Sequence, residues 1–174
     1  MERKGFDRLY YFIDLHSTCI KPDYTAKRGE IPTQFYPMAK EALQLMSQCE
    51  DIRLTMYTCS HPHEISKYAL FFEEHGINFD WVNENPEVFT VEGAYGNYDK
   101  KPYFNAMFED KAGFNGEEDW KRVYRFFAER MGIIKATTVD NGFWVTNTTA
   151  KSPEKLDYYA NSLKEYHTPI LQKD

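Results

Sequence analysis

The sequence has few cysteines, no long apolar run and no excess of basic residues, and each of these absences excludes a class of protein. The three cysteines, Cys19, Cys49 and Cys59, are widely spaced and odd in number, which is typical of reduced thiols and not of a disulfide framework. No apolar run approaches the roughly 20 residues that a membrane-spanning helix needs. The net charge of −6 argues against non-specific nucleic-acid binding, which requires a basic surface.

These absences favour a globular protein of the cytoplasm that has no membrane partner. The charged start, Met1 to Gly5, is not followed by the apolar region and cleavage site of a secretion signal. We therefore expect an intracellular protein. A small phosphorylated ligand bound through a metal stays compatible with the acidic net charge.

What the sequence contains is an alternation of apolar runs and amphipathic segments. The apolar runs predict strands over residues 10–14, 52–58, 77–82, 104–108 and 133–139. Apolar residues at helical spacing predict helices over residues 38–49, 63–75 and 117–131. This alternation predicts one α/β domain over residues 1–174, with a Rossmann-like three-layer fold around a mainly parallel sheet.

The remaining segments are expected to be loops and a C-terminal hairpin and helix. Residues 19–37 and 83–99 are loop-like in composition, and long loops beside a site often cover it. Within residues 140–174, Asp140-Asn141-Gly142 is a hairpin-type turn that an edge strand over 143–145 would follow. A last helix is expected to start at Ser152-Pro153. In the helix 63–75, the residues expected to face the core are Ile65, Ala69, Leu70 and Phe72.

Acidic and hydroxyl side chains follow three of the predicted strands. Asp14 ends the first strand, Thr58 ends the second, and Glu109-Asp110 follow the fourth. Open parallel sheets place their chemistry at the carboxyl ends of the strands, where these side chains would converge. Two unit charges 4 Å apart repel by about 4 kcal/mol at an effective dielectric of 20, so three carboxylates there need a cation. Oxygen ligands favour Mg²⁺.

The stretch around Asp14 resembles motif I of the haloacid dehalogenase (HAD) superfamily. In that motif an aspartate, any residue, a second aspartate, any residue and a threonine follow one another. Asp14 and Thr18 match the motif, and His16 stands in the place of the second aspartate. The run from Lys101 to Phe114 is also similar to that of small phage and bacterial HAD-like proteins.

Further pieces follow in the order of the family's Ser/Thr, lysine and acidic pair. These pieces are Thr58, Lys100-Lys101 and Glu109-Asp110, and the likeness extends over residues 10–115. The resemblance therefore implies an HAD-like domain. The intervals between Asp14 and Thr58, and between Thr58 and Lys101, have no room for a large cap domain.

The resemblance implies Mg²⁺-dependent hydrolysis of a phosphomonoester through an aspartyl-phosphate on Asp14. It implies that Mg²⁺ is held by Asp14, the backbone carbonyl of His16, and Glu109 or Asp110. His16 would serve as the general acid and base, since histidine titrates near ~6.5.

The resemblance also implies a phosphate-binding set. Thr58 would donate its hydroxyl to a phosphoryl oxygen, with Ser60 beside it. Lys101 would supply positive charge, and Lys100 is the alternative. Without a cap, the site would be open to a phosphorylated small molecule or to an accessible phosphorylated macromolecule. A neighbouring subunit of a homo-oligomer is another candidate for a lid.

Other interpretations stay open at this point. The replacement by His16 also fits a non-catalytic phosphate- or metal-binding module with a regulatory role. Hydrolysis of a carbon–halogen bond is disfavoured because Glu109-Asp110 imply a metal that this chemistry does not use. Cys59, His61 and His63 suggest zinc, but structural zinc needs four ligands in paired spacings.

Overall fold

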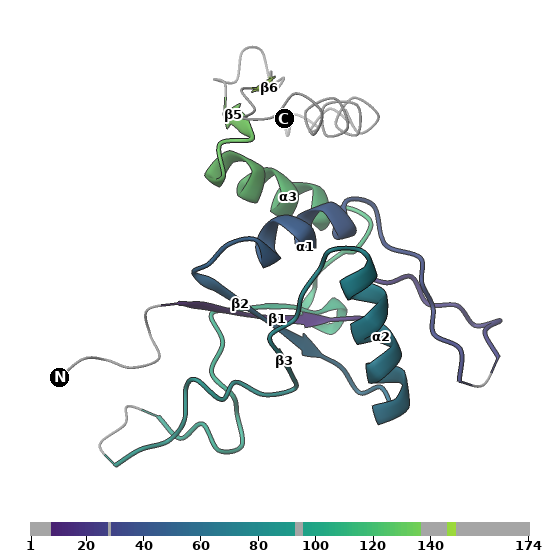
Figure 1. The fold of residues 1–174 in the computed structure, drawn as a ribbon, viewed down its shortest axis with the longest axis vertical. Helices are drawn as coiled ribbons and strands as arrows, with labels where there is room; N and C mark the ends of the chain where they lie inside the picture. Colours follow the sequence, from purple (N-terminus) through teal and green to yellow (C-terminus); the bar gives the residue numbers. More distant parts are fainter. Residues whose placement is uncertain (1–7, 28, 93–95, 137–145, 149–174) are drawn as a thin grey trace, which may run out of the picture. The chain divides into compact units, whose positions relative to one another are not determined.

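The computed structural model describes residues 8–27, 29–92, 96–136 and 146–148 (Figure 1). The contacts divide the chain into two compact units, residues 1–124 and residues 125–174, and the expectation of one domain over 1–174 stays a prediction. In chain order the described elements are β1 Leu9–Asp14, α1 Ala39–Ser47, β2 Ile52–Tyr57, α2 Pro62–Glu74, β3 Trp81–Val82, β4 Ala106–Phe108, the 3₁₀ turn η1 Asp110–Ala112, α3 Asp119–Arg130, β5 Ile134–Ala136 and β6 Thr146–Thr148.

The first unit is built on a four-stranded sheet in the order β3-β2-β1-β4. All three pairings are parallel, because after each strand the chain crosses back to the edge of the sheet where that strand began. The register sets Asp14 beside Tyr57 and Ile13 beside Phe108, so β1, β2 and β4 end at the same edge of the sheet. The predicted Rossmann-like α/β arrangement with a parallel sheet is confirmed.

Strand β1 is central because its side chains are apolar on both faces. Tyr10, Phe12 and Ile13 have no exposed surface. Alternate residues of a strand point to one face, so Tyr10 and Phe12 share a face. On that face they contact the rings of Tyr103 and Phe104, which belong to the segment leading into β4.

The loop between β3 and β4 lies against the amino ends of the strands. Its Glu87 contacts Arg8 at 3.4 Å and Arg53 at 3.3 Å, and accepts a 2.9 Å hydrogen bond from the hydroxyl of Tyr10. Tyr98 packs on Tyr103 in the same region. These contacts lie at the opposite end of β1 from Asp14, so this part of the loop 83–99 does not have the expected place over the site. Aromatic side chains hold it there by packing on Tyr10.

Helix α2 turns a different side to the core from the one expected. Tyr68 and Phe72 are buried, whereas Ala69 is exposed and Leu70 is 60% exposed. The prediction of Ala69 and Leu70 as core residues is therefore wrong. The inward stripe runs through positions 65, 68 and 72, because the large ring of Phe72 packs on Phe79.

Strand β3 is shorter than the predicted strand 77–82. The backbone NH of Leu54 donates to a side-chain oxygen of Asp80 at 2.8 Å, and the NH of Asp80 donates to the carbonyl of Leu54 at 2.8 Å. The Asp80 carboxylate thus takes the place of a backbone acceptor in the ladder. Regular pairing with β2 begins only at Trp81.

The second unit contains an antiparallel pair, β5 with β6. Strand β5 covers the first part of the predicted strand 133–139, and its partner β6 is Thr146–Thr148. The turn at 140–142, the edge strand expected over 143–145 and the helix from Ser152 lie outside the described residues. None of the described helices is both long enough and apolar enough to span a membrane.

Candidate metal and phosphate site

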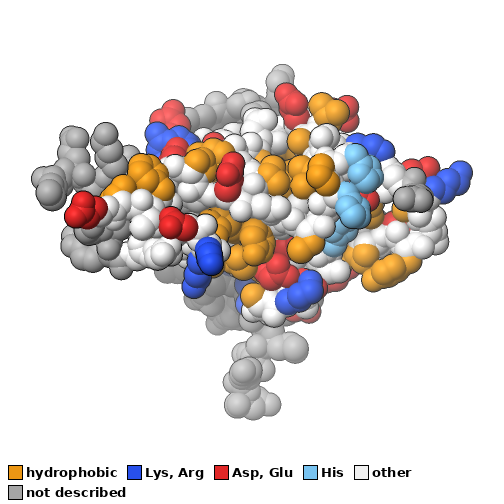
Figure 2. All heavy atoms as spheres, turned by 90° about the horizontal axis from the view of Figure 1, so that it is seen from below, with side chains coloured by type: hydrophobic (Ala, Val, Ile, Leu, Met, Phe, Trp, Pro, Cys, Tyr) orange, Lys and Arg blue, Asp and Glu red, His pale blue; other side chains and the backbone are white. Residues whose placement is uncertain are grey.

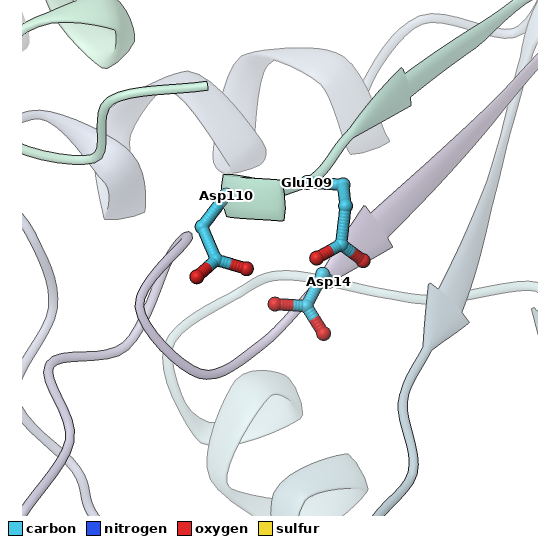
Figure 3. Close-up of side chains that lie close together, drawn as sticks. All are labelled: Asp14, Glu109 and Asp110. Atoms are coloured by element: carbon cyan, nitrogen blue, oxygen red, sulfur yellow. The ribbon is translucent and has the colours of Figure 1, made fainter. Parts of the chain in front are cut away.

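Three carboxylates meet at the edge of the sheet where the strands end (Figure 3). Asp14 is the last residue of β1, Glu109 follows β4, and Asp110 begins η1. One oxygen of each carboxylate lies within 4.8 Å of the others, and all three side chains are half-buried. In the described part of the chain, no other three potential metal-ligating side chains come as close together. The structure thus brings together the carboxylates that the sequence predicted to converge.

Thr18 holds this cluster in place. Its hydroxyl donates to Asp14 Oδ2 at 2.9 Å and accepts from the backbone NH of Asp110 at 3.0 Å. Its carbonyl oxygen accepts from the indole NH of Trp120 at 2.7 Å. The Thr18 side chain is completely buried, so these bonds are shielded from water. One residue therefore joins the end of β1 to the segments after β4.

A tight turn after β1 brings Thr18 to this position. Ser17 adopts a left-handed conformation with φ of 61°, and its NH donates to the carbonyl of Ile20 at 2.9 Å. Gly116 approaches so closely that a Cβ atom there would lie 2.7 Å from the Thr18 carbonyl oxygen. A larger residue at 116 would therefore push the turn away from the acidic cluster.

The carboxylates of the cluster have perturbed acidities. Burial raises the pKa of Asp14, the hydrogen bond from Thr18 opposes this shift, and the charge of Asp110 adds to it. Burial likewise raises the pKa of Glu109, with its Asp110 neighbour contributing. The hydrogen bond shared with Glu109 lowers the pKa of Asp110, and Lys111 lowers it further. Burial and the neighbouring carboxyl groups thus both oppose full ionisation of Asp14 and Glu109.

Thr58 follows β2 and is held by Asn83. The Thr58 NH donates to Asn83 Oδ1 at 2.8 Å, and Asn83 Nδ2 donates to the Thr58 carbonyl at 2.8 Å. The hydroxyls of Thr58 and Ser60 lie 2.9 Å apart, just before α2 begins. Since Tyr57 pairs with Asp14, these hydroxyls belong to the strand end next to the carboxylates. Their contact with phosphate stays a prediction.

His16 is held by a buried tyrosine that the sequence did not single out. Its Nε2 atom lies 2.7 Å from the hydroxyl of Tyr68, and the two rings meet edge to face. Burial lowers the pKa of His16, an effect that the charge of Glu64 opposes. Burial raises the pKa of Tyr68 far above its usual range, so its hydroxyl keeps its proton.

The structure does not bring Lys100 or Lys101 to the carboxylates. Both are exposed, and they precede Asn105, whose NH donates to the carbonyl of Tyr10 in the first part of β1. The lysine at the cluster is Lys111, with its Nζ 3.2 Å from Asp110 and 3.6 Å from Glu109. The side chain of Lys111 is 82% exposed.

A groove of about 770 Å³ begins beside the cluster. Its wall includes His16 and Ser17, the loop of residues 22–32 and the first turn of α2. The predicted loop 19–37 therefore lies next to the candidate site. His61 and His63 line the groove, but their metal-ligating atoms are not part of the carboxylate cluster.

The donor set of the cluster fits Mg²⁺. Asp14, Glu109 and Asp110 offer carboxylate oxygens alone, which suit a hard divalent cation that keeps several water ligands. These three carboxylates lie close together, and the described cation in contact with two of them is Lys111. The His16 carbonyl as a further ligand stays a prediction.

Sequence reasoning missed Tyr68, Asn83 and Lys111 as parts of the site. The sequence did offer a sign of Asn83. Asparagine after a predicted strand often adopts the left-handed backbone conformation, and Asn83 has φ of 57°. Tyr68 lies three positions after Ile65, which is the spacing of core residues on one face of a helix. Lys111 directly follows the acidic pair in the sequence.

Comparison with protein-family models and with curated proteins gives no match. A similar solved structure is that of a conserved protein from Bacteroides thetaiotaomicron, with a TM-score of 0.51 and 18% sequence identity. The alignment covers 71% of this chain and 92% of that protein. At this identity the likeness supports the α/β fold and leaves the chemistry to the residues of the site.

Proposed function

We propose that this protein is a Mg²⁺-dependent phosphomonoester hydrolase of the HAD type that forms an aspartyl-phosphate on Asp14. The observation that carries the proposal is the convergence of Asp14, Glu109 and Asp110 within 4.8 Å at the carboxyl edge of a parallel sheet. The match of Asp14 and Thr18 to the family motif supports it. Bound Mg²⁺ would neutralise the carboxylates and reduce the repulsion of an anionic phosphate.

In the first step a carboxylate oxygen of Asp14 attacks phosphorus and the bond to the ester oxygen breaks. Thr18 holds the Asp14 carboxylate through Oδ2, which fixes its orientation before the attack. The leaving oxygen takes a proton from His16. The hydroxyls of Thr58 and Ser60 donate to the oxygens of the transferred phosphoryl group.

In the second step His16 takes a proton from water, and the water oxygen attacks the phosphorus of the aspartyl-phosphate. The bond between phosphorus and the Asp14 oxygen breaks, so inorganic phosphate leaves and the carboxylate is restored. Tyr68 orients the His16 ring throughout, through the 2.7 Å contact with Nε2.

The test is phosphate release from an aryl phosphate and a panel of phosphomonoesters, measured with Mg²⁺ and with a chelator. Wild type is compared with Asp14→Asn, in which the amide can still accept from Thr18 but is a poor nucleophile. We expect Asp14→Asn to reduce kcat by at least about 10³-fold, in the range found when a covalent nucleophile is removed. Removal of Mg²⁺ should have a comparable effect.

Unchanged turnover in Asp14→Asn would refute the nucleophilic role. Mg²⁺ binding without phosphate release from any substrate would favour the non-catalytic phosphate- or metal-binding module. In that case the replacement of the family's second aspartate by His16 would account for the lack of catalysis. His16→Asp, which restores the family pair, should keep or raise turnover if the site is catalytic.

A further inference from the structure

We propose that the groove beside His16 binds the leaving group of the substrate and that this leaving group is a nucleoside. The substrate class would then be a nucleoside monophosphate. This inference rests on the proposed function, because it takes the phosphoryl group to be held at Asp14.

The groove has the position and size for such a group. His16 and Ser17 belong both to the turn after Asp14 and to the groove wall, so the leaving group of a phosphate at Asp14 would enter here. Lys67 of α2 donates a hydrogen bond to the carbonyl of Gly29, which joins the loop that lines the groove to the helix. A volume of about 770 Å³ lies within the range of small-molecule sites.

The groove is lined by flat rings from two segments, the loop 22–32 and the start of α2. His61 and His63 are exposed and stack with their ring centroids 5.8 Å apart and their planes 12° apart. Histidine side chains form a compact patch on the face of the molecule drawn in Figure 2. Tyr24 of the loop lines the same groove, and its ring is 93% exposed. Rings of this kind stack on nucleobases, whereas a sugar phosphate has no planar face.

The charge of the groove opposes a second anionic group. Its described lining contains one lysine, Lys27, and three carboxylates, Asp23, Glu30 and Glu64. This surplus of negative charge repels a polyphosphate or a nucleic-acid strand. A neutral nucleoside meets no such repulsion, and its hydroxyls and base edge can hydrogen-bond to the polar side chains of the lining.

The first test compares kcat/KM for AMP and UMP with kcat/KM for ADP, glucose 6-phosphate and a phosphoserine peptide. We expect AMP and UMP to exceed glucose 6-phosphate by about ten-fold or more, the scale of one stacked base. Tyr24→Ala, at a position that contributes no buried contact, should raise KM for AMP by about ten-fold. The matched control is Phe89→Ala, which removes a ring that is 65% exposed in the loop 83–99 and should leave KM unchanged.

The second test needs no turnover. Binding of adenosine and uridine to the full chain is measured by NMR titration, for wild type, Tyr24→Ala and Phe89→Ala. Binding that Tyr24→Ala weakens supports the groove assignment, even if no phosphate is released from any ester and the proposed hydrolysis fails. Lack of nucleoside binding overturns the assignment. If glucose 6-phosphate or the phosphopeptide is turned over as fast as AMP, the assignment is also overturned, even if hydrolysis depends on Asp14.

Discussion

The two ends of the parallel sheet both carry charged side chains, but they balance the charge differently. At the amino ends of β1 and β2, two arginines face two carboxylates. Arg8 lies 3.4 Å from Glu87, and Arg53 lies 3.3 Å from Glu87 and 3.7 Å from Asp80. Each negative charge there has a positive neighbour within the protein, which is the arrangement of a structural network.

At the carboxyl ends, three carboxylates share one described lysine. Lys111 contacts Glu109 and Asp110, but its side chain is largely exposed and screened by water. The three carboxylates lie half-buried beside the groove, and among the described residues Lys111 is the cation in contact with them. The comparison shows that unbalanced charge, and not the number of charged residues, distinguishes the candidate site.

The largest expected effect is the response of stability to Mg²⁺. At 100 times its Kd, a ligand stabilises the folded state by about 2.7 kcal/mol, which corresponds to a rise in Tm of about 5–10 °C for a chain of this size. Asp14→Asn should lose most of this rise because one anionic ligand is gone. Thermal unfolding with Mg²⁺ and with a chelator measures it, and equal Mg²⁺ shifts in both proteins would contradict the site.

The same variant tests the sign of the Asp14 pKa shift. Burial raises this pKa, so the folded protein binds the proton more tightly than the unfolded chain does. The stabilisation is present below the ordinary pKa of 3.8 and is lost as pH rises through the folded pKa. In chelator at neutral pH, Asp14→Asn should therefore be more stable than wild type, and the difference should shrink in acid.

The next prediction compares Thr18 with Thr55, a buried threonine in β2. Thr18→Val leaves the Asp110 NH without its acceptor and Asp14 without its donor, which should lower the free energy of unfolding by about 1–3 kcal/mol. Thr55→Val removes a hydroxyl that donates to the Glu84 carbonyl at 3.2 Å. Chemical denaturation should show a smaller loss for Thr55→Val, and only Thr18→Val should weaken Mg²⁺ binding.

A smaller effect is expected for the tyrosine that orients His16. Tyr68→Phe should reduce kcat by about ten-fold, the smaller part of the 10²–10⁴-fold that a general acid–base group contributes. The Tyr68 hydroxyl is the hydrogen-bond partner of His16 Nε2, so its loss should shift the His16 pKa and the limb of the pH profile that reports it. Tyr103→Phe, which removes a hydroxyl near the amino ends, is the control. Equal losses in both variants would argue against a positioning role.

The smallest effect compares two lysines. Lys111→Gln should weaken phosphate-ester binding by about two- to three-fold, because the charge of this largely exposed side chain is screened by water. Lys101→Gln should change KM by less, since Lys101 precedes the strand that starts beside Tyr10. Measured KM values decide between them. A larger effect at Lys101 would support Lys101 as the lysine that supplies positive charge to the phosphate, as the family resemblance implies.

The fold and the acidic cluster could be predicted because both depend on local patterns. Strand and helix periodicity predicts the parallel order, and that order places Asp14, Glu109 and Asp110 at one edge. The position of the loop 83–99 could not be predicted, because it depends on how Tyr98 and Tyr103 pack on Tyr10. Lys100 and Lys101 follow that loop, so the same packing removes them from the carboxylates.

The side of α2 that faces the core was missed for a related reason. Ile65 and Phe72 fit two helical stripes, one through Ala69 and one through Tyr68, and the periodicity alone does not choose between them. Tyr68 is on the buried stripe because its hydroxyl has a partner in His16 and its ring packs near Phe72.

The bonds of Thr18 have a consequence for the order of events during folding. They join Thr18 to Asp110 and to Trp120, residues that are 92 and 102 positions further along the chain. A nascent chain can pair β1 with β2 long before these residues are synthesised, but Glu109 and Asp110 can join Asp14 only afterwards. On the proposed function, Mg²⁺ affinity would therefore arise late and would mark the completion of the first unit during synthesis.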